Sequence, residues 1–319
     1  MFITKLMQYG QLNFDEISGK PLSGDRSWEN CHRAFLKYRG KAIDGETMEY
    51  LCLHLSWYLA SWGMLRNSFL RRYSHKIHEP VIRLIYDPEW DDLWDLDFAR
   101  VSEKKYADAV LKLSQALNDI YGKLPDNTDQ SITDTLQTKI LLGTLGCVPA
   151  FDTYLKSALK NAPDGAGLGS TRYTAETLTA LGAFYAAHKS EFEGKQREWN
   201  NFIKRERQAE EQIEYPSAKV LDMCLFQYGF FADWVAHHAR AFLEKKGKKL
   251  DARKIECRKN VALLRAICLT YLLGDGAVDT AGMSPTDLTL LSDGVKDLDA
   301  TLQTLVKQKK HQNFKKYME

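Results

Sequence analysis

The sequence lacks the features that mark a secreted or disulfide-bonded protein. Its six cysteines are scattered along 319 residues, and no two are spaced as CxxC. The N-terminus has no basic start followed by a long apolar stretch, so we expect no targeting peptide. Free cysteines in a chain of this size are typical of a reducing compartment. We therefore expect a cytoplasmic protein without a disulfide framework.

A membrane-spanning segment is also missing. Residues 50–65, YLCLHLSWYLASWGML, carry no Asp, Glu, Lys or Arg, but they are shorter than the roughly 20 residues that a bilayer core requires. His54, Ser56 and Ser61 lie within the stretch, and Arg66 follows it directly. We expect a buried central helix here and no contact with a membrane.

Motifs for metals and phosphates are absent as well. The pairs His75/His78 and His237/His238 have no cysteine or carboxylate at a recognised ligand spacing. The glycine-rich residues 165–170, GAGLGS, follow no convincing strand and lack the lysine of a phosphate-binding loop. Neither a metal nor a cofactor is therefore expected, and the glycine-rich stretch is interpreted as a linker.

What the sequence does contain is helical periodicity over most of its length, which predicts an all-α fold. Only residues 81–86, VIRLIY, have the β-branched density of a strand, and a helix is equally compatible with them. Thr174 is a candidate N-cap, with Glu176 in the first turn that follows. The expected helices cover residues 46–73, 104–122, 174–191, 195–213, 218–246, 257–273 and 285–308.

Charge is distributed unevenly, although the formal net charge is only +2. Residues 86–98 hold six acids and no base, whereas residues 245–259 hold eight Lys or Arg against two acids. Basic patches attract polyanions such as nucleic acid, although a solvated helix face has the same composition. We divide the chain into a helical core, residues 1–235, and a basic helical C-terminal extension, residues 236–319. The candidate contacts to a DNA backbone are Lys245, Lys246, Lys248, Lys249, Arg253 and Lys254.

The most informative segment is residues 138–152, TKILLGTLGCVPAFD. An apolar stretch lies between Lys139 and Asp152, and Gly146 and Pro149 interrupt any helix between them. Pro149 is placed to begin a new helix, with Asp152 in or just before its first turn, where the helix dipole favours a carboxylate. Two helices joined by this corner would direct both side chains toward one space.

These residue types suit the cleavage of an N-glycosidic bond. Such cleavage builds positive charge on the sugar, which a fixed carboxylate at Asp152 would stabilise while it orients water. Desolvation in an apolar pocket favours the neutral amine of a lysine, so Lys139 would attack the sugar or merely pair with Asp152. The alternative is structural: an ion pair that ties two helices together, or Asp152 as an N-cap.

The Lys–apolar–Pro–x–x–Asp arrangement resembles the helix-hairpin-helix DNA glycosylases, in particular their 8-oxoguanine-glycosylase-like branch. The resemblance implies that Lys139 and Asp152 form an active site in a compact multi-helix glycosylase-like domain. The stretches LSWYLASWGMLRNSFL and YPSAKVLDMCLF extend the resemblance to roughly residues 45–230. One departure is that the residues before Lys139, PDNTDQSITDT, contain no GxG for a phosphate-binding hairpin.

A glycosylase also needs a pocket for the extruded base, formed by aromatic and amide-bearing side chains. The candidates are Trp57, Tyr58, Trp62, Arg66 and Asn67, although aromatic residues at helical spacing also build cores. In residues 215–229, Lys219 and Asp222 are three apart and are interpreted as an ion pair on one helix face. We predict a monomeric DNA glycosylase that excises a damaged or modified base, in repair or in defence against phage DNA. The competing hypothesis is a non-catalytic helical module that binds nucleic acid or protein.

Overall fold

The computed structural model describes residues 1–20, 24–66, 68–94, 96–125, 127, 131–251 and 253–307. Across these residues the chain forms α-helices and short 3-10 helices without a strand, which confirms the all-α prediction. The α-helices are α1 (Phe2–Ser18), α2 (Ser27–Tyr38), α3 (Gly45–Ser61), α4 (Glu79–Ile85), α5 (Lys104–Gly122), α6 (Asp134–Thr144), α7 (Thr153–Lys160), α8 (Ala175–Ala187), α9 (Lys189–Glu206), α10 (Ser217–Lys245), α11 (Arg258–Leu273) and α12 (Pro285–Lys307). The 3-10 helices are η1 (Gly24–Arg26), η2 (Phe69–Arg72), η3 (His75–His78), η4 (Pro88–Leu93), η5 (Phe98–Ser102), η6 (Ala209–Glu211) and η7 (Ile255–Cys257).

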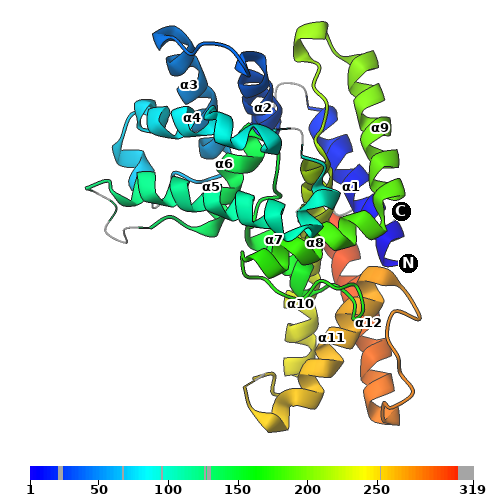
Figure 1. Ribbon diagram of the computed structural model, residues 1–319. Helices are drawn as coiled ribbons and strands as arrows, with labels where there is room; N and C mark the ends of the chain where they lie inside the picture. The colour runs from blue at the N-terminus through cyan, green and yellow to red at the C-terminus, as the bar shows by residue number, and fades with distance from the viewer. Residues whose placement is uncertain are drawn as a thin grey trace.

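Helix α10 is the central element of the fold. It packs against α1, α7, α9, α11 and α12, and its N-terminal half is buried on nearly every side. Figure 1 shows α2 to α6 grouped above and beside it, with α11 and α12 around its lower half. The helix passes without a break through residue 235, where we expected the core to give way to a basic extension. The lower half of the molecule is therefore continuous with the upper half through one helix.

Helix α3 differs from the expected buried central helix. Met48, Leu51 and Leu55 are buried, but Leu53 is 50% exposed and Trp57 is 59% exposed on the opposite face. Helix α3 packs against α2, α4 and α6 without being enclosed, so the prediction that other helices surround it was wrong. It also ends at Ser61, well before residue 73, because Gly63 adopts a φ of 75° and the chain turns.

Two other expected boundaries shift for local reasons. Residues 81–85 fall in α4, a helix, and Tyr86 is its C-cap, because Pro80 stands at the helix start and Val81, Ile82 and Ile85 all face the core. The expected helix over residues 174–191 is divided at His188 into α8 and α9. The predicted cap at its start is confirmed, since the Thr174 hydroxyl accepts a hydrogen bond from the Thr177 amide.

No helix in the described part of the chain combines the length and the apolar character needed to cross a bilayer.

Candidate functional site

The corner between α6 and α7 is shaped by Gly146. This residue follows the end of α6 with a φ of 68°, and its amide donates to the Leu141 carbonyl as the helix closes. A Cβ at this position would lie 2.6 Å from Cγ of Pro216. Position 146 therefore requires glycine for two reasons: the positive φ of the backbone and the close approach of the residues that lead into α10.

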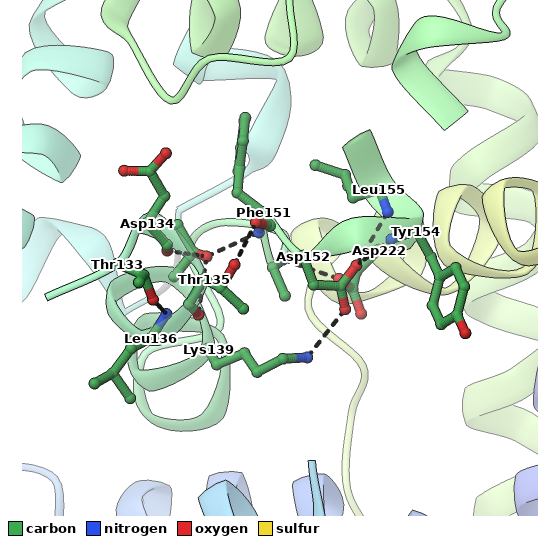
Figure 2. A network of polar contacts seen from close by, with 12 residues as sticks. Thr133, Asp134, Thr135, Leu136, Lys139, Phe151, Asp152, Tyr154, Leu155 and Asp222 are labelled. Carbon is green, nitrogen blue, oxygen red and sulfur yellow. Dashed lines mark hydrogen bonds and ion pairs between the residues drawn. The ribbon is translucent and has the colours of Figure 1, made fainter. Parts of the chain in front are cut away.

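Hydrogen bonds fix the corner to both neighbouring helices, as Figure 2 shows. The Phe151 amide donates to the Thr138 hydroxyl at 2.8 Å, and the Thr135 hydroxyl donates to the Phe151 carbonyl at 2.9 Å. From the other side, Asp222 on α10 accepts the Ala150 amide at 2.9 Å. A chain segment held by two helices in this way keeps the following residue, Asp152, in one position.

Asp152 and Lys139 are in direct contact, as the sequence predicts. Nζ of Lys139 lies 3.1 Å from Oδ2 of Asp152, and the two side chains are 5% and 13% exposed. Oδ1 of Asp152 accepts the amides of Tyr154 and Leu155 at 3.0 Å, which makes Asp152 the N-cap of α7. Pro149 does not begin this helix, contrary to our expectation, because the Asp152 side chain sets the start at Thr153.

A second buried ion pair lies close to the first one, on α10. Nζ of Lys219 is 2.9 Å from Oδ2 of Asp222, so the predicted pair is confirmed, but both side chains are less than a tenth exposed. The Lys219 ammonium also lies 5.0 Å from the ring centroid of Trp28, a cation–π distance. One signal of this burial is present in the sequence: within YPSAKVLDMCLF these are the only charges in an apolar stretch.

The two ion pairs enclose a cavity of about 10 Å³, which is room for about one water molecule. The other cavity-lining residues include Asn13, Tyr58, Trp62 and Phe226. Burial raises the pKa of Tyr58 well above its usual value, and the nearby carboxylates add to this effect, so the phenol stays protonated. Its ring fits closely because residue 143 is glycine, where a Cβ would lie 2.4 Å from Cε1 of Tyr58.

An aromatic row leads away from the Lys139–Asp152 pair. Nζ of Lys139 lies 4.6 Å from the centroid of Trp62, which meets Phe226 edge-on at 5.6 Å. Phe226 in turn contacts Tyr154 at 5.1 Å, and Tyr154 contacts Phe230 at 5.2 Å. Tyr154 and Phe230 line a groove of about 910 Å³ between α7, α10 and α11. The small cavity and the large groove are thus separated by a wall of aromatic rings.

The other base-pocket candidates do not join this cluster. Tyr58 and Trp62 are four residues apart on one face of the chain, whereas Trp57 is about 100° away around α3 and faces outward. Arg66 is exposed beyond the helix end and does not line the cavity. Asn67 lies outside the described residues.

The six candidates for DNA-backbone contact lie far from the corner. They occupy the end of α10 and the segment that leads to α11, at the lower end of the molecule in Figure 1. Asp222 and Lys245 are separated by 23 residues of one helix, or about 35 Å at 1.5 Å per residue. Five of their side chains are exposed, with Arg253 92% exposed beside Asp251, whereas Lys248 is half-buried. We call residues 245–254 the basic tip.

Other chemistry at the corner is limited by burial. Cys147 is 1% exposed, and burial raises the pKa of its thiol to about 12, so the thiol remains protonated. Within the described ranges, no three His, Cys, Asp or Glu side chains lie together as ligands for a metal ion. The buried charged groups at the corner are those of the two ion pairs, and a third, more exposed pair joins Lys156 to Asp134 at 3.7 Å. Comparisons of this chain with protein-family models, curated proteins and solved structures find no match.

Proposed function

We propose that this protein is a DNA glycosylase-like enzyme that removes a base turned out of the helix stack, with Asp152 and Lys139 as its catalytic residues. One observation carries the proposal: a carboxylate fixed at a helix N-terminus touches a lysine ammonium beside a wall of aromatic rings. The resemblance of residues 138–152 to the helix-hairpin-helix glycosylases supports the same assignment.

The chemistry assigned to Asp152 follows from its hydrogen bonds. Two backbone amides hold the carboxylate in place, so it needs no reorganisation when positive charge develops on the sugar. In this scheme the bond between C1′ and the base nitrogen breaks, and its electron pair leaves with the base. Water oriented by Asp152 adds its oxygen to C1′, and the proton that the water loses neutralises the departing base. Lys139 either remains an ammonium that fixes the carboxylate, or attacks C1′ itself through a neutral amine.

The size of the cavity limits how a substrate would bind. A volume of about 10 Å³ cannot hold a base, so the sugar would approach Asp152 from its partly exposed side. The groove on the other side of Tyr154, at about 910 Å³, has room for the base. In this arrangement the base would stay in the groove, and the sugar would pass the edge of the Tyr154 ring so that C1′ reaches Asp152.

A second candidate function is a non-catalytic module that binds nucleic acid. It is favoured by the same closed cavity and by the fact that both carboxylate oxygens of Asp152 already have partners. In that case the Lys139–Asp152 pair joins α6 to α7, the hydrogen bond from Ala150 to Asp222 joins their corner to α10, and only the surface of the molecule meets DNA.

Excision assays distinguish the two functions. Single-stranded and duplex DNA with oxidised or otherwise modified bases is incubated with the protein, and free base and abasic sites are measured. We expect Asp152→Asn to reduce excision by about 100-fold or more, as expected when a preorganised electrostatic group is removed. The control is Asp44→Asn, because Asp44 is also an N-cap, on α3 and away from the cavity. A wild-type protein that binds the DNA but releases no base from any substrate would favour the second function.

A further inference from the structure

A groove lies between α7, α10 and α11, beside the candidate site. Its volume of about 910 Å³ is at the upper end of the range for ligand pockets. Thr153 and Tyr154 form its upper end, directly after Asp152 in the chain. Leu250 and Val261 line it as well, and Leu250 follows Lys249 of the basic tip. The groove therefore extends from the catalytic candidates toward the basic tip.

The charged side chains that line the groove are mostly cationic. Lys156, Lys160, Arg240 and Arg265 line it against a single acid, Asp233, so the formal charge of the lining is +3 with His237 neutral. Lys160 is exposed and has no ion-pair partner among the residues that the structure describes.

The remaining three cations have carboxylate partners outside the groove lining. Lys156 is 3.7 Å from Asp134, and Arg240 is 3.8 Å from Glu244; exposed pairs at these distances are weak. Arg265 is held more firmly, because its guanidinium donates to the Ala162 carbonyl and to Asp164, both at 2.8 Å. A polyanion would therefore meet one rigid cation and three that are able to reorient toward it.

Aromatic side chains line the same groove. Tyr154, Phe230 and Trp234 are partly buried and line the groove. The ring planes of Tyr154 and Phe230 meet at an angle of 78°. Cations that follow a backbone, interleaved with aromatic rings that stack on bases, are the combination that binds single-stranded nucleic acid. A duplex would not use these rings, because its bases are stacked inside the helix.

We infer that this groove binds a single-stranded segment of nucleic acid, with its phosphates on the four cations and its bases against the aromatic wall. The inference rests on the proposed function, for which it names the substrate class: an unpaired strand that leads one nucleotide past Tyr154 to Asp152. Binding is separable from excision, so each is tested with its own readout.

The test uses the wild-type protein and a labelled oligothymidine of about twelve unmodified nucleotides, which offers no modified base for excision. Fluorescence anisotropy is measured over a range of salt concentrations. We expect Lys160→Glu/Arg240→Glu to weaken binding roughly tenfold or more, and to lower the salt slope by about 0.7 for each phosphate that the variant no longer neutralises.

The control variant is Lys123→Glu/Arg197→Glu. Lys123 is an exposed residue at the end of α5, as Lys160 is for α7, and Arg197 pairs with Glu193 at 3.8 Å on α9 as Arg240 does with Glu244. We expect this variant to bind like the parent. Equal binding by the groove variant and the control would overturn the inference.

Competition measurements test the class of ligand. An unlabelled single strand should displace the probe at lower concentration than a duplex of the same sequence. Displacement by polyglutamate or duplex as effective as by single strand would overturn the single-strand assignment. Strand binding in the groove without excision by wild-type protein would contradict the proposed enzyme but leave the groove assignment standing. Excision that survives unchanged in the groove variant would contradict the groove assignment but leave the proposed enzyme standing.

Discussion

Asp152 holds Lys139 with one carboxylate oxygen and the first turn of α7 with the other. The same side chain thus serves as a helix cap and as the partner of a buried cation. A change at this position alters two interactions at once, and experiments on it need variants that separate them.

The first prediction separates structure from chemistry at the Lys139–Asp152 pair. Asp152→Asn keeps the cap, because asparagine caps helices as well as aspartate does, but it leaves a buried ammonium without its carboxylate. We expect a loss of about 3–5 kcal/mol in the free energy of unfolding, measured with urea. Adding Lys139→Met should restore most of this stability without restoring excision. Equal recovery of both properties would mean that the pair is only structural.

The second prediction concerns the reaction path. Lys139 touches a carboxylate and lies 4.6 Å from the centre of the Trp62 ring, and both neighbours stabilise an ammonium. We therefore expect water, not the amine, to attack the sugar. Incubation with substrate DNA and borohydride should give no covalent adduct. An adduct that is present in the wild-type protein and missing in Lys139→Gln would establish the amine as nucleophile.

The third prediction concerns the basic tip. Lys245 ends α10, and Lys246 and Lys249 follow it; all three are exposed, whereas Lys248 is half-buried. Reversing all four charges should flatten the salt dependence of duplex binding by about 0.9 for each phosphate that is no longer neutralised. The slope is obtained from binding titrations at several salt concentrations. An unchanged slope would show that the tip is only a solvated surface.

The fourth prediction concerns a buried network far from the corner. Glu29 is 1% exposed and accepts hydrogen bonds from Arg26, Arg207 and the Tyr215 hydroxyl, which fixes the segment before α10 to α2. Glu29→Gln removes the carboxylate partner of the buried Arg207 guanidinium and leaves Arg26 with its longer contact to Glu211 at 3.8 Å, so we expect a loss of about 3–5 kcal/mol in the free energy of unfolding.

A control for this change is Glu103→Gln, on the surface. Glu103 lies 3.7 Å from Arg100, and both side chains are about half exposed. Its substitution should change the free energy of unfolding by less than about 1 kcal/mol in the same urea titration. Similar effects of the two substitutions would contradict the role assigned to Glu29.

The fifth prediction is a loss of stability in mild acid. Burial lowers the pKa of His78 from 6.5 to about 3, and burial, aided by Lys219, lowers the pKa of His32 to about 4. The unfolded chain binds protons at both sites below about pH 6.5, whereas the folded chain does not. Stability is therefore complete above pH 6.5 and falls as the pH drops, by about 2 kcal/mol for each histidine at pH 5.

Thermal unfolding between pH 5 and pH 7.5 measures this dependence. In His78→Gln the side chain keeps a hydrogen-bonding group for the Tyr121 hydroxyl but does not titrate, so the melting temperature should depend less on pH. His237→Gln, at an exposed position, should leave the dependence as it is in the wild-type protein. A parallel pH profile for His78→Gln would contradict the assignment.

The sequence was sufficient to predict the contact between Lys139 and Asp152. Gly146 and Pro149 mark a corner between two helices, and a corner brings together residues that are 13 apart in the chain. The shared cavity was not predictable in this way, because Asn13 and Tyr58 come from two other helices, α1 and α3. Periodicity pairs Lys219 with Asp222, but it contains no information about which distant surfaces cover the pair.

The aromatic residues of α3 show the same limit. Trp57, Tyr58 and Trp62 are close in sequence and of one chemical type, so composition does not separate them. The helix presents Tyr58 to Gly143 on α6 and turns Trp57 to solvent, and this choice depends on where α2, α4 and α6 pack. The expected boundary after residue 235 rested on the change in charge alone. The helical pattern of residues 218–246 runs through that position without a break.

The unbroken course of α10 has a consequence for the ligands of this protein. The corner that Asp222 fixes and the basic tip are separated by about 35 Å of rigid helix. A strand stacked at about 3.4 Å per nucleotide would need about ten nucleotides to touch both ends. Shorter oligonucleotides would reach the corner or the tip but not both, so affinity should rise steeply with strand length up to that size and level off beyond it.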